Sequence, residues 1–133
     1  MKKKLLEVLI LIFLLILLFT TFVLSDDIPR MTKEELKAML GNPDLVILDF
    51  RFASDYWDSD LKIKGAERPY YGYAHMYPHE YPGKTLVLYC VTPNEGTSAA
   101  GAQRLKEKGF TKVYVLKGGW EEWLKAGYPT EKK

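Results

Sequence analysis

The chain contains one cysteine, Cys90, and its neighbours give this thiol the setting of a nucleophile. An apolar run, Thr85–Tyr89, ends directly at Cys90, and a helix is predicted shortly afterwards, over Thr97–Lys108. The thiolate is the nucleophilic form of cysteine, and the free N–H groups at a helix N-terminus stabilise negative charge. This order of strand, cysteine, loop and helix predicts covalent chemistry at Cys90. The alternative is an inert thiol buried at the end of a core strand.

The loop between the cysteine and the helix can surround the sulfur with backbone amides. Pro93 stiffens the loop, Asn94 tolerates left-handed backbone angles, and Gly96 permits close approach. Either Thr97 or Ser98 can cap the helix. Amides that point inward form a concavity for anions, which suits the negative terminal sulfur of a cysteine persulfide. Besides Cys90 as nucleophile, the predicted substrate-binding residues of this segment are Val91, Thr92, Asn94, Glu95, Gly96 and Thr97.

The elements that must position this segment form an α/β pattern. Short runs that are apolar throughout indicate strands buried on both faces, and helical segments separate them. Strands are expected at 45–48, 85–89 and 113–116, and helices at 31–40, 53–57, 97–108 and 119–125. We therefore expect a small, mostly parallel central sheet flanked by helices on both faces. Ligands of such sheets bind beyond the carboxyl ends of the strands, where Cys90 and Asp49 both fall.

Three segments resemble the rhodanese family of sulfurtransferases, in the family's order and over about residues 28–129. Leu45–Arg51, which reads LVILDFR, resembles the family's strand that ends in Asp-x-Arg. Thr85–Lys108 resembles its strand, cysteine, loop and helix. Gly118–Pro129 resembles its closing GG-x-x-x-W-x-x-A-G-x-P signature, the most specific of the three. By this resemblance the chain is identified as a single rhodanese-like domain.

The resemblance implies transfer of a sulfane sulfur in two covalent steps. Cys90 would take sulfur from thiosulfate, polysulfide or a persulfide, carry it as its own persulfide, and pass it to a thiol or cyanide. Asp49 and Arg51 match the strand-end pair of the family. They are expected to contribute to substrate binding by orienting nearby loops and forming hydrogen bonds with them. No cofactor is implied. The alternative is a rhodanese-like module that carries sulfur to a partner or only docks.

Two positions of the cysteine loop differ from those of proteins with a similar loop. The sixth position of the family's loop often holds arginine, and here it holds Glu95. A carboxylate at the mouth of the loop repels a dianion, which argues against thiosulfate as the physiological donor. Cysteine phosphatases clamp phosphate with an arginine six residues beyond the cysteine, and that position is Gly96. Phosphatase chemistry is therefore not expected.

The first 25 residues have the pattern of an export signal or a membrane anchor. Lysines at 2–4 precede an apolar run that ends at Leu24. The lysines are expected to stay in the cytoplasm, so that a domain at 26–133 is periplasmic or otherwise extracytoplasmic. Small residues permit cleavage after Ser25. Without cleavage, residues 5–24 would anchor the domain, although the apolar run is near the lower limit of about 17 residues for a bilayer span.

Charge and composition limit the partners. Of 19 basic and 17 acidic residues, three lysines and one glutamate lie in the N-terminal segment, which leaves the rest neutral. A neutral domain offers no basic face for nucleic acid. His75 and His79 are separated by Pro78, which prevents the helical spacing of a metal pair, so no metal site is expected.

Aromatic residues raise two further expectations. Trp120 and Trp123 are expected in the core, as anchors of the last helix. A tyrosine-rich loop either packs its rings over the sheet or forms a partner surface or lid, because tyrosine is enriched at protein interfaces. Its tyrosines are Tyr70, Tyr71, Tyr73, Tyr77 and Tyr81.

Overall fold

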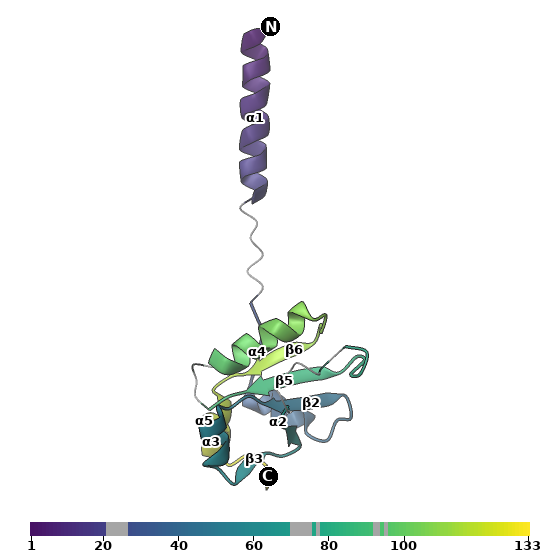
Figure 1. The fold of residues 1–133 in the computed structure, drawn as a ribbon, viewed down its shortest axis with the longest axis vertical. Helices are drawn as coiled ribbons and strands as arrows, with labels where there is room; N and C mark the ends of the chain where they lie inside the picture. The colour runs from purple at the N-terminus through teal and green to yellow at the C-terminus, as the bar shows by residue number, and fades with distance from the viewer. Residues whose placement is uncertain (21–26, 70–75, 77, 92–93, 95) are drawn as a thin grey trace.

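The computed structural model of the chain describes residues 1–20, 27–69, 76, 78–91, 94 and 96–133, and the side chains of all of these except 17–20. Helices and strands alternate along most of the domain, except that three strands follow one another after α3 (Figure 1). In chain order the elements are α1 (Lys2–Thr20), β1 (Arg30–Met31), α2 (Lys33–Met39), β2 (Leu45–Asp49), α3 (Ala53–Trp57), β3 (Leu61–Ile63), β4 (Ala66–Glu67), β5 (Thr85–Tyr89), α4 (Gly96–Glu107), β6 (Val113–Leu116), α5 (Gly119–Lys125) and β7 (Thr130–Lys132).

Five strands form one parallel sheet in the order β1-β6-β5-β2-β4. β2 and β5 pair along their whole length, from Leu45 opposite Thr85 to Asp49 opposite Tyr89. This register places the carboxyl end of β2 beside Cys90, which directly follows β5. The predicted parallel sheet is therefore confirmed. A second sheet, the antiparallel pair of β3 and β7, was not expected from the sequence.

Both faces of the parallel sheet are covered, because alternate residues of each strand point to opposite sides. On one face, α2 and α5 supply Leu36, Trp120 and Trp123, and these pack with Val87 and Tyr89 of β5. On the other face, α4 contributes Ala102 and Leu105, which pack with the intervening β5 residues Leu86 and Leu88. The predicted cover of helices on both faces and the core positions of the two tryptophans are confirmed.

Local signals explain where the helices begin and end. The hydroxyl of Thr32 accepts a hydrogen bond from the Glu35 amide, and the Glu35 carboxylate accepts one from the Thr32 amide. This reciprocal capping box starts α2 and lowers the pKa of Glu35, because the backbone N–H of Thr32 stabilises the carboxylate. After α4, Gly109 adopts a φ of 104°, a left-handed conformation that favours glycine.

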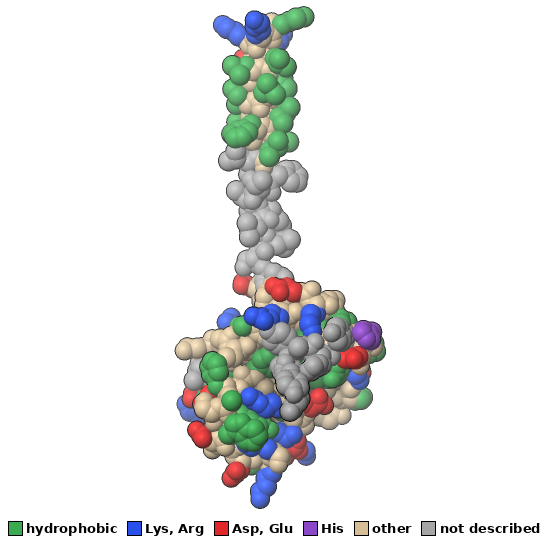
Figure 2. Space-filling model, in the orientation of Figure 1, with side chains coloured by type: hydrophobic (Ala, Val, Ile, Leu, Met, Phe, Trp, Pro, Cys, Tyr) green, Lys and Arg blue, Asp and Glu red, His purple; other side chains and the backbone are tan. Residues whose placement is uncertain are grey.

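The apolar side chains of α1 from Leu5 to Ile16 are exposed. Figure 2 shows them covering the visible face of the helix, with lysines at its N-terminal end. Among the described residues, no helix is both long enough and apolar enough to cross a membrane. Residues 21–26 lie outside the described part of the chain. The division into an N-terminal signal or anchor and a domain at 26–133 stays a prediction.

Candidate active site

Cys90 lines a cavity of about 360 Å³ at the carboxyl edge of the sheet. The cysteine is 6% exposed, so its sulfur lies in the wall of the cavity and a reactant must enter to reach it. A cavity of this size can hold a small molecule or the tip of a side chain. Its described lining residues are Phe52, Asp55, Cys90, Val91, Asn94, Gly96 and Thr97.

The structure brings several residues of the predicted site together at this cavity. Val91 and Asn94 of the loop, and Gly96 and Thr97 of α4, line it with Cys90. The helix begins at Gly96, one residue before the predicted start, so its first amides lie at the cavity wall. The remaining two predicted loop residues, Thr92 and Glu95, lie outside the described residues. Binding of substrate by any of these residues stays a prediction.

Ser98 is a site residue whose contact the sequence did not reveal. Its hydroxyl donates a hydrogen bond to Cys90 Sγ at 3.4 Å, and its side chain is fully buried. The sequence indicated Ser98 only as a candidate helix cap, because contact with the sulfur depends on how the first turn of α4 folds back beside β5. Next to it, Thr97 Oγ1 is buried at the cavity without a hydrogen-bond partner among the described residues.

We expect Ser98→Ala to slow alkylation of Cys90 by iodoacetamide by roughly tenfold near neutral pH, since a hydrogen bond to a charged group contributes about 1.5–3 kcal/mol. In the variant, the sulfur loses the hydrogen bond that the Ser98 hydroxyl donates to it. Alkylation is followed by intact mass. Ser59→Ala is the matched control, because the Ser59 hydroxyl bonds the Leu61 carbonyl instead. An unchanged alkylation rate in a folded Ser98→Ala variant would show that Ser98 does not affect the reactivity of Cys90.

The start of α5 holds the entry of the cysteine loop. The Trp120 N–H donates to the Cys90 carbonyl at 2.8 Å, and the Glu121 N–H donates to the Val91 carbonyl at 3.1 Å. The turn before these amides uses two glycines with φ of 83° and 61°, which are left-handed conformations. The paired glycines of the closing sequence signature, Gly118–Gly119, therefore place α5 against the loop that carries the cysteine.

One wall of the cavity comes from the segment after β2, which the sequence did not connect to the site. Phe52 precedes α3 and Asp55 lies in its first turn, and both line the cavity with Cys90. They reach it because β2 and β5 are neighbours, so the segments that follow the two strands meet at the same edge. The Phe52 side chain is 66% exposed, and Asp55 is half-buried.

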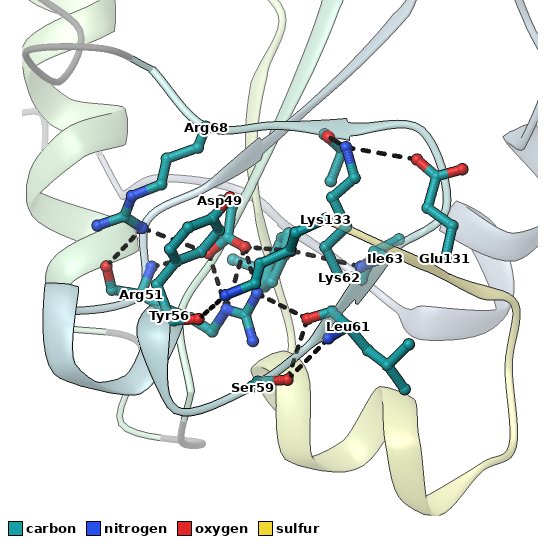
Figure 3. Close-up of polar contacts among 12 residues, drawn as sticks. Asp49, Arg51, Tyr56, Ser59, Leu61, Lys62, Ile63, Arg68, Glu131 and Lys133 are labelled. Carbon is teal, nitrogen blue, oxygen red and sulfur yellow. Dashed lines mark hydrogen bonds and ion pairs between the residues drawn. The ribbon is translucent and has the colours of Figure 1, made fainter.

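Asp49 and Arg51 form a buried ion pair at the carboxyl end of β2 (Figure 3). Both are 2% exposed, and Arg51 Nη2 lies 2.6 Å from Asp49 Oδ2. Arg51 also donates to the Leu61 carbonyl at 3.1 Å, and the Tyr89 hydroxyl donates to Asp49 at 2.7 Å. Burial and the Asp49 carboxylate raise the pKa of Tyr89, which keeps its hydroxyl a donor. The guanidinium lies 4.5 Å from the centroid of the Trp120 ring.

This network ties the carboxyl end of β2 to β3, β5 and α5. Asp49 and Arg51 are not among the described residues that line the Cys90 cavity. They line a neighbouring cavity of about 140 Å³ with Phe50, Arg68 and Pro69. The geometry agrees with the expected role in orienting nearby loops. Binding of substrate by either residue stays a prediction.

Tyr81 is the described member of the tyrosine-rich loop. It packs against the core at Phe110, with the ring centroids 6.4 Å apart. This contact favours the packing interpretation for Tyr81. The other four tyrosines, Tyr70, Tyr71, Tyr73 and Tyr77, lie outside the described residues, and the partner surface or lid stays a prediction.

Fold, cysteine loop and closing glycine turn together define a known class of domain. The family model of the rhodanese-like domain matches residues 32–126, and the chain belongs to this family. It is 31% identical over 115 residues to the thiosulfate sulfurtransferase GlpE of Glaesserella parasuis serovar 5 (strain SH0165), covering 81% of this chain and 97% of that protein. The expected family is thereby confirmed.

Two solved structures are similar to the whole domain. One, from Rhodopseudomonas palustris CGA009, is a protein of unknown function described as a possible tyrosine phosphatase; the TM-score is 0.65 at 27% identity, over 78% of this chain and 85% of that chain. The other is a rhodanese-like domain from Anabaena sp., with a TM-score of 0.61 at 28% identity, over 79% and 80% of the two chains. The expected rhodanese-like fold is confirmed, and the family and the GlpE relative support a sulfurtransferase-type function.

Proposed function

We propose that this protein moves a sulfane sulfur from a donor to a thiol or cyanide through a persulfide on Cys90. The observation that carries the proposal is the position of Cys90 in the wall of a 360 Å³ cavity at the start of α4, with the Ser98 hydroxyl 3.4 Å from its sulfur. The first amides of a helix favour the anionic forms of both the thiol and the persulfide.

The transfer consists of two displacements at sulfur. In the first, the Cys90 thiolate attacks the outer sulfur of a donor, the donor's S–S bond breaks, and the rest of the donor leaves with the electron pair. In the second, an acceptor thiolate or cyanide attacks the outer sulfur of the Cys90 persulfide. The bond to Sγ then breaks, its electron pair returns to Sγ, and the thiolate is restored. Neither step needs an external oxidant or reductant.

The domain acts outside the cytoplasm in this proposal, exported by residues 1–25. Three features support this: the lysines at 2–4, the apolar sequence that follows them, and the exposed apolar side chains of α1. The N-terminal segment is then removed after Ser25 or kept as an anchor to the cytoplasmic membrane.

Intact mass of the protein, isolated from separated cell fractions, tests both parts. After incubation with polysulfide, an alkyl persulfide or thiosulfate, we expect the wild type to gain the mass of one sulfur atom and Cys90→Ser to gain none. A wild type that none of the three donors modifies would refute the persulfide. The full chain should be found in the membrane fraction, or a chain without residues 1–25 outside the cytoplasm. An uncleaved chain in the soluble cytoplasm would refute export.

A further inference from the structure

The wall of the Cys90 cavity that α3 provides carries a carboxylate and an aromatic ring. Phe52 and Asp55 are three residues apart at the start of the helix, a spacing that places two side chains on the same side. Both line the cavity that contains Cys90. A reactant at the sulfur therefore lies beside the ring and the carboxylate as well as the cysteine loop.

Among the residues that the structure describes, no cation forms an ion pair with the Asp55 carboxylate. No described residue forms a hydrogen bond with its side chain either. The described lining of the cavity contains no lysine or arginine. The sequence adds a second acidic residue, Glu95, to the cysteine loop. At this wall of the cavity, the Asp55 carboxylate thus disfavours an anionic reactant and favours a cationic one.

Among the described residues, the cationic groups that contact α3 lie over the rings of Tyr56 and Trp57. Arg51 is paired with Asp49, and Arg68 shares the 140 Å³ cavity with that pair. Arg68 and Lys133 both lie over the Tyr56 ring, at 4.2 and 4.1 Å from its centroid. α3 therefore presents Tyr56 to a cluster of basic groups, while Asp55, the preceding residue, lines the cavity of the cysteine.

We propose that the reactants of this site are thiols and persulfides that carry an ammonium group, and that Asp55 and Phe52 select them. The inference rests on the sulfur transfer proposed above. A carboxylate attracts the ammonium group directly, and an exposed aromatic ring adds a cation–π contact. Phe52 is 66% exposed, so its ring is available to a bound reactant. The same carboxylate repels thiosulfate.

Sulfur transfer to an ammonium-bearing thiol follows the second displacement described under the proposed function. An aminoalkyl thiol loses its proton to solvent, and its thiolate attacks the outer sulfur of the Cys90 persulfide. A new S–S bond forms on the acceptor, the bond to Sγ breaks, and the electron pair returns to Sγ. The ammonium group stays protonated beside Asp55 throughout and takes no part in the bond changes.

The test is a single turnover with three acceptors that differ in charge: cysteamine, mercaptoethanol and mercaptopropionate. Cys90 is first converted to its persulfide, and loss of one sulfur atom is followed by intact mass, with each rate expressed per thiolate. We expect wild type to react at least about tenfold faster with cysteamine than with mercaptopropionate, because the two acceptors carry opposite charges and one charge interaction at about 4 Å contributes a factor of about five even in bulk water. Added salt should reduce this ratio.

Variants test whether the preference for cysteamine comes from Phe52 and Asp55. In Asp55→Asn, the ratio of the cysteamine rate to the mercaptopropionate rate should fall most of the way to one. Asp55→Glu, which keeps the charge, should retain the wild-type ratio. Phe52→Leu should reduce the cysteamine rate and leave the mercaptopropionate rate unchanged. Asp58→Asn is the matched control, because Asp58 is an exposed carboxylate at the end of α3 outside the described cavity lining, and it should keep the wild-type ratio.

The outcomes separate the two proposals. A persulfide that forms on Cys90 and reacts equally with all three acceptors, or a ratio that Asp55→Asn leaves intact, overturns the charge selection and leaves the sulfur transfer standing. A wild type on which no donor forms a persulfide overturns the sulfur transfer and the selection with it.

Discussion

Replacing Cys90 by alanine is expected to lower the steady-state rate of sulfur transfer by about a thousandfold or more, to the rate of the reaction in buffer. The reason is that the chain has one cysteine, so no other thiol can carry the sulfur. Turnover is measured with polysulfide as the donor and with a thiol or cyanide as the acceptor. Transfer to cyanide is measured as the thiocyanate formed, and transfer to a thiol is measured as the persulfide of that thiol.

The same measurement distinguishes an enzyme from a sulfur carrier. An enzyme shows wild-type turnover far above that of Cys90→Ala. A wild type that gains sulfur on Cys90 but turns over no faster than the alanine variant acts as a carrier for a partner. The variant's thermal unfolding serves as the control for folding, since truncating one small side chain at the edge of the core should leave the fold intact.

Replacing Arg51 by leucine is expected to lower the free energy of unfolding by about 3–5 kcal/mol. The change leaves the Asp49 carboxylate buried without its close cation, with hydrogen bonds from the Tyr89 hydroxyl and from the backbone N–H of residue 51 and with the Arg68 guanidinium 3.9 Å away. It also removes the hydrogen bond to the Leu61 carbonyl and the contact with the Trp120 ring. Chemical denaturation followed by circular dichroism measures the loss, which is a large share of the stability of a small domain.

Two further variants show whether the loss comes from the unpaired charge. A double variant with leucine at both Asp49 and Arg51 should be more stable than Arg51→Leu alone, because no buried charge is left without a partner. Lys33→Gln is the control at a surface pair, where Lys33 lies 3.7 Å from Glu122, and it should cost less than about 1 kcal/mol. Equal losses in Arg51→Leu and Lys33→Gln would contradict the structural role of the buried pair.

The main architecture could be predicted because its signals are local and strong. The runs at 45–48 and 86–89 are apolar throughout, which is typical of strands covered on both faces, and the long connection between them, which contains α3, allows parallel pairing. The position of Cys90 beyond β5 could be predicted for the same reason. The two short strands β3 and β7 could not, because a three-residue segment such as Thr-Glu-Lys has no distinctive pattern.

The parts of the site that could not be predicted depend on contacts between distant segments. Asp55 and Phe52 reach the cavity through the pairing of β2 with β5, and nothing in their own neighbourhood indicates a site. The contact of Ser98 with Cys90 depends on the packing of α4 against β5. Asp49 and Arg51 stood out in the sequence, but their burial away from the described cavity lining depends on Tyr89, Leu61 and Trp120.

The two hydrogen bonds from α5 to the carbonyls of Cys90 and Val91 have a consequence for local unfolding. Fraying of the first turn of α5 releases both carbonyls, and movement of the loop entry in turn breaks two hydrogen bonds at the start of the helix. We therefore expect Cys90 and α5 to unfold locally as one unit and to lose their order together. A partner that binds α5 is thereby expected to stabilise the backbone at Cys90 and Val91 without contacting it.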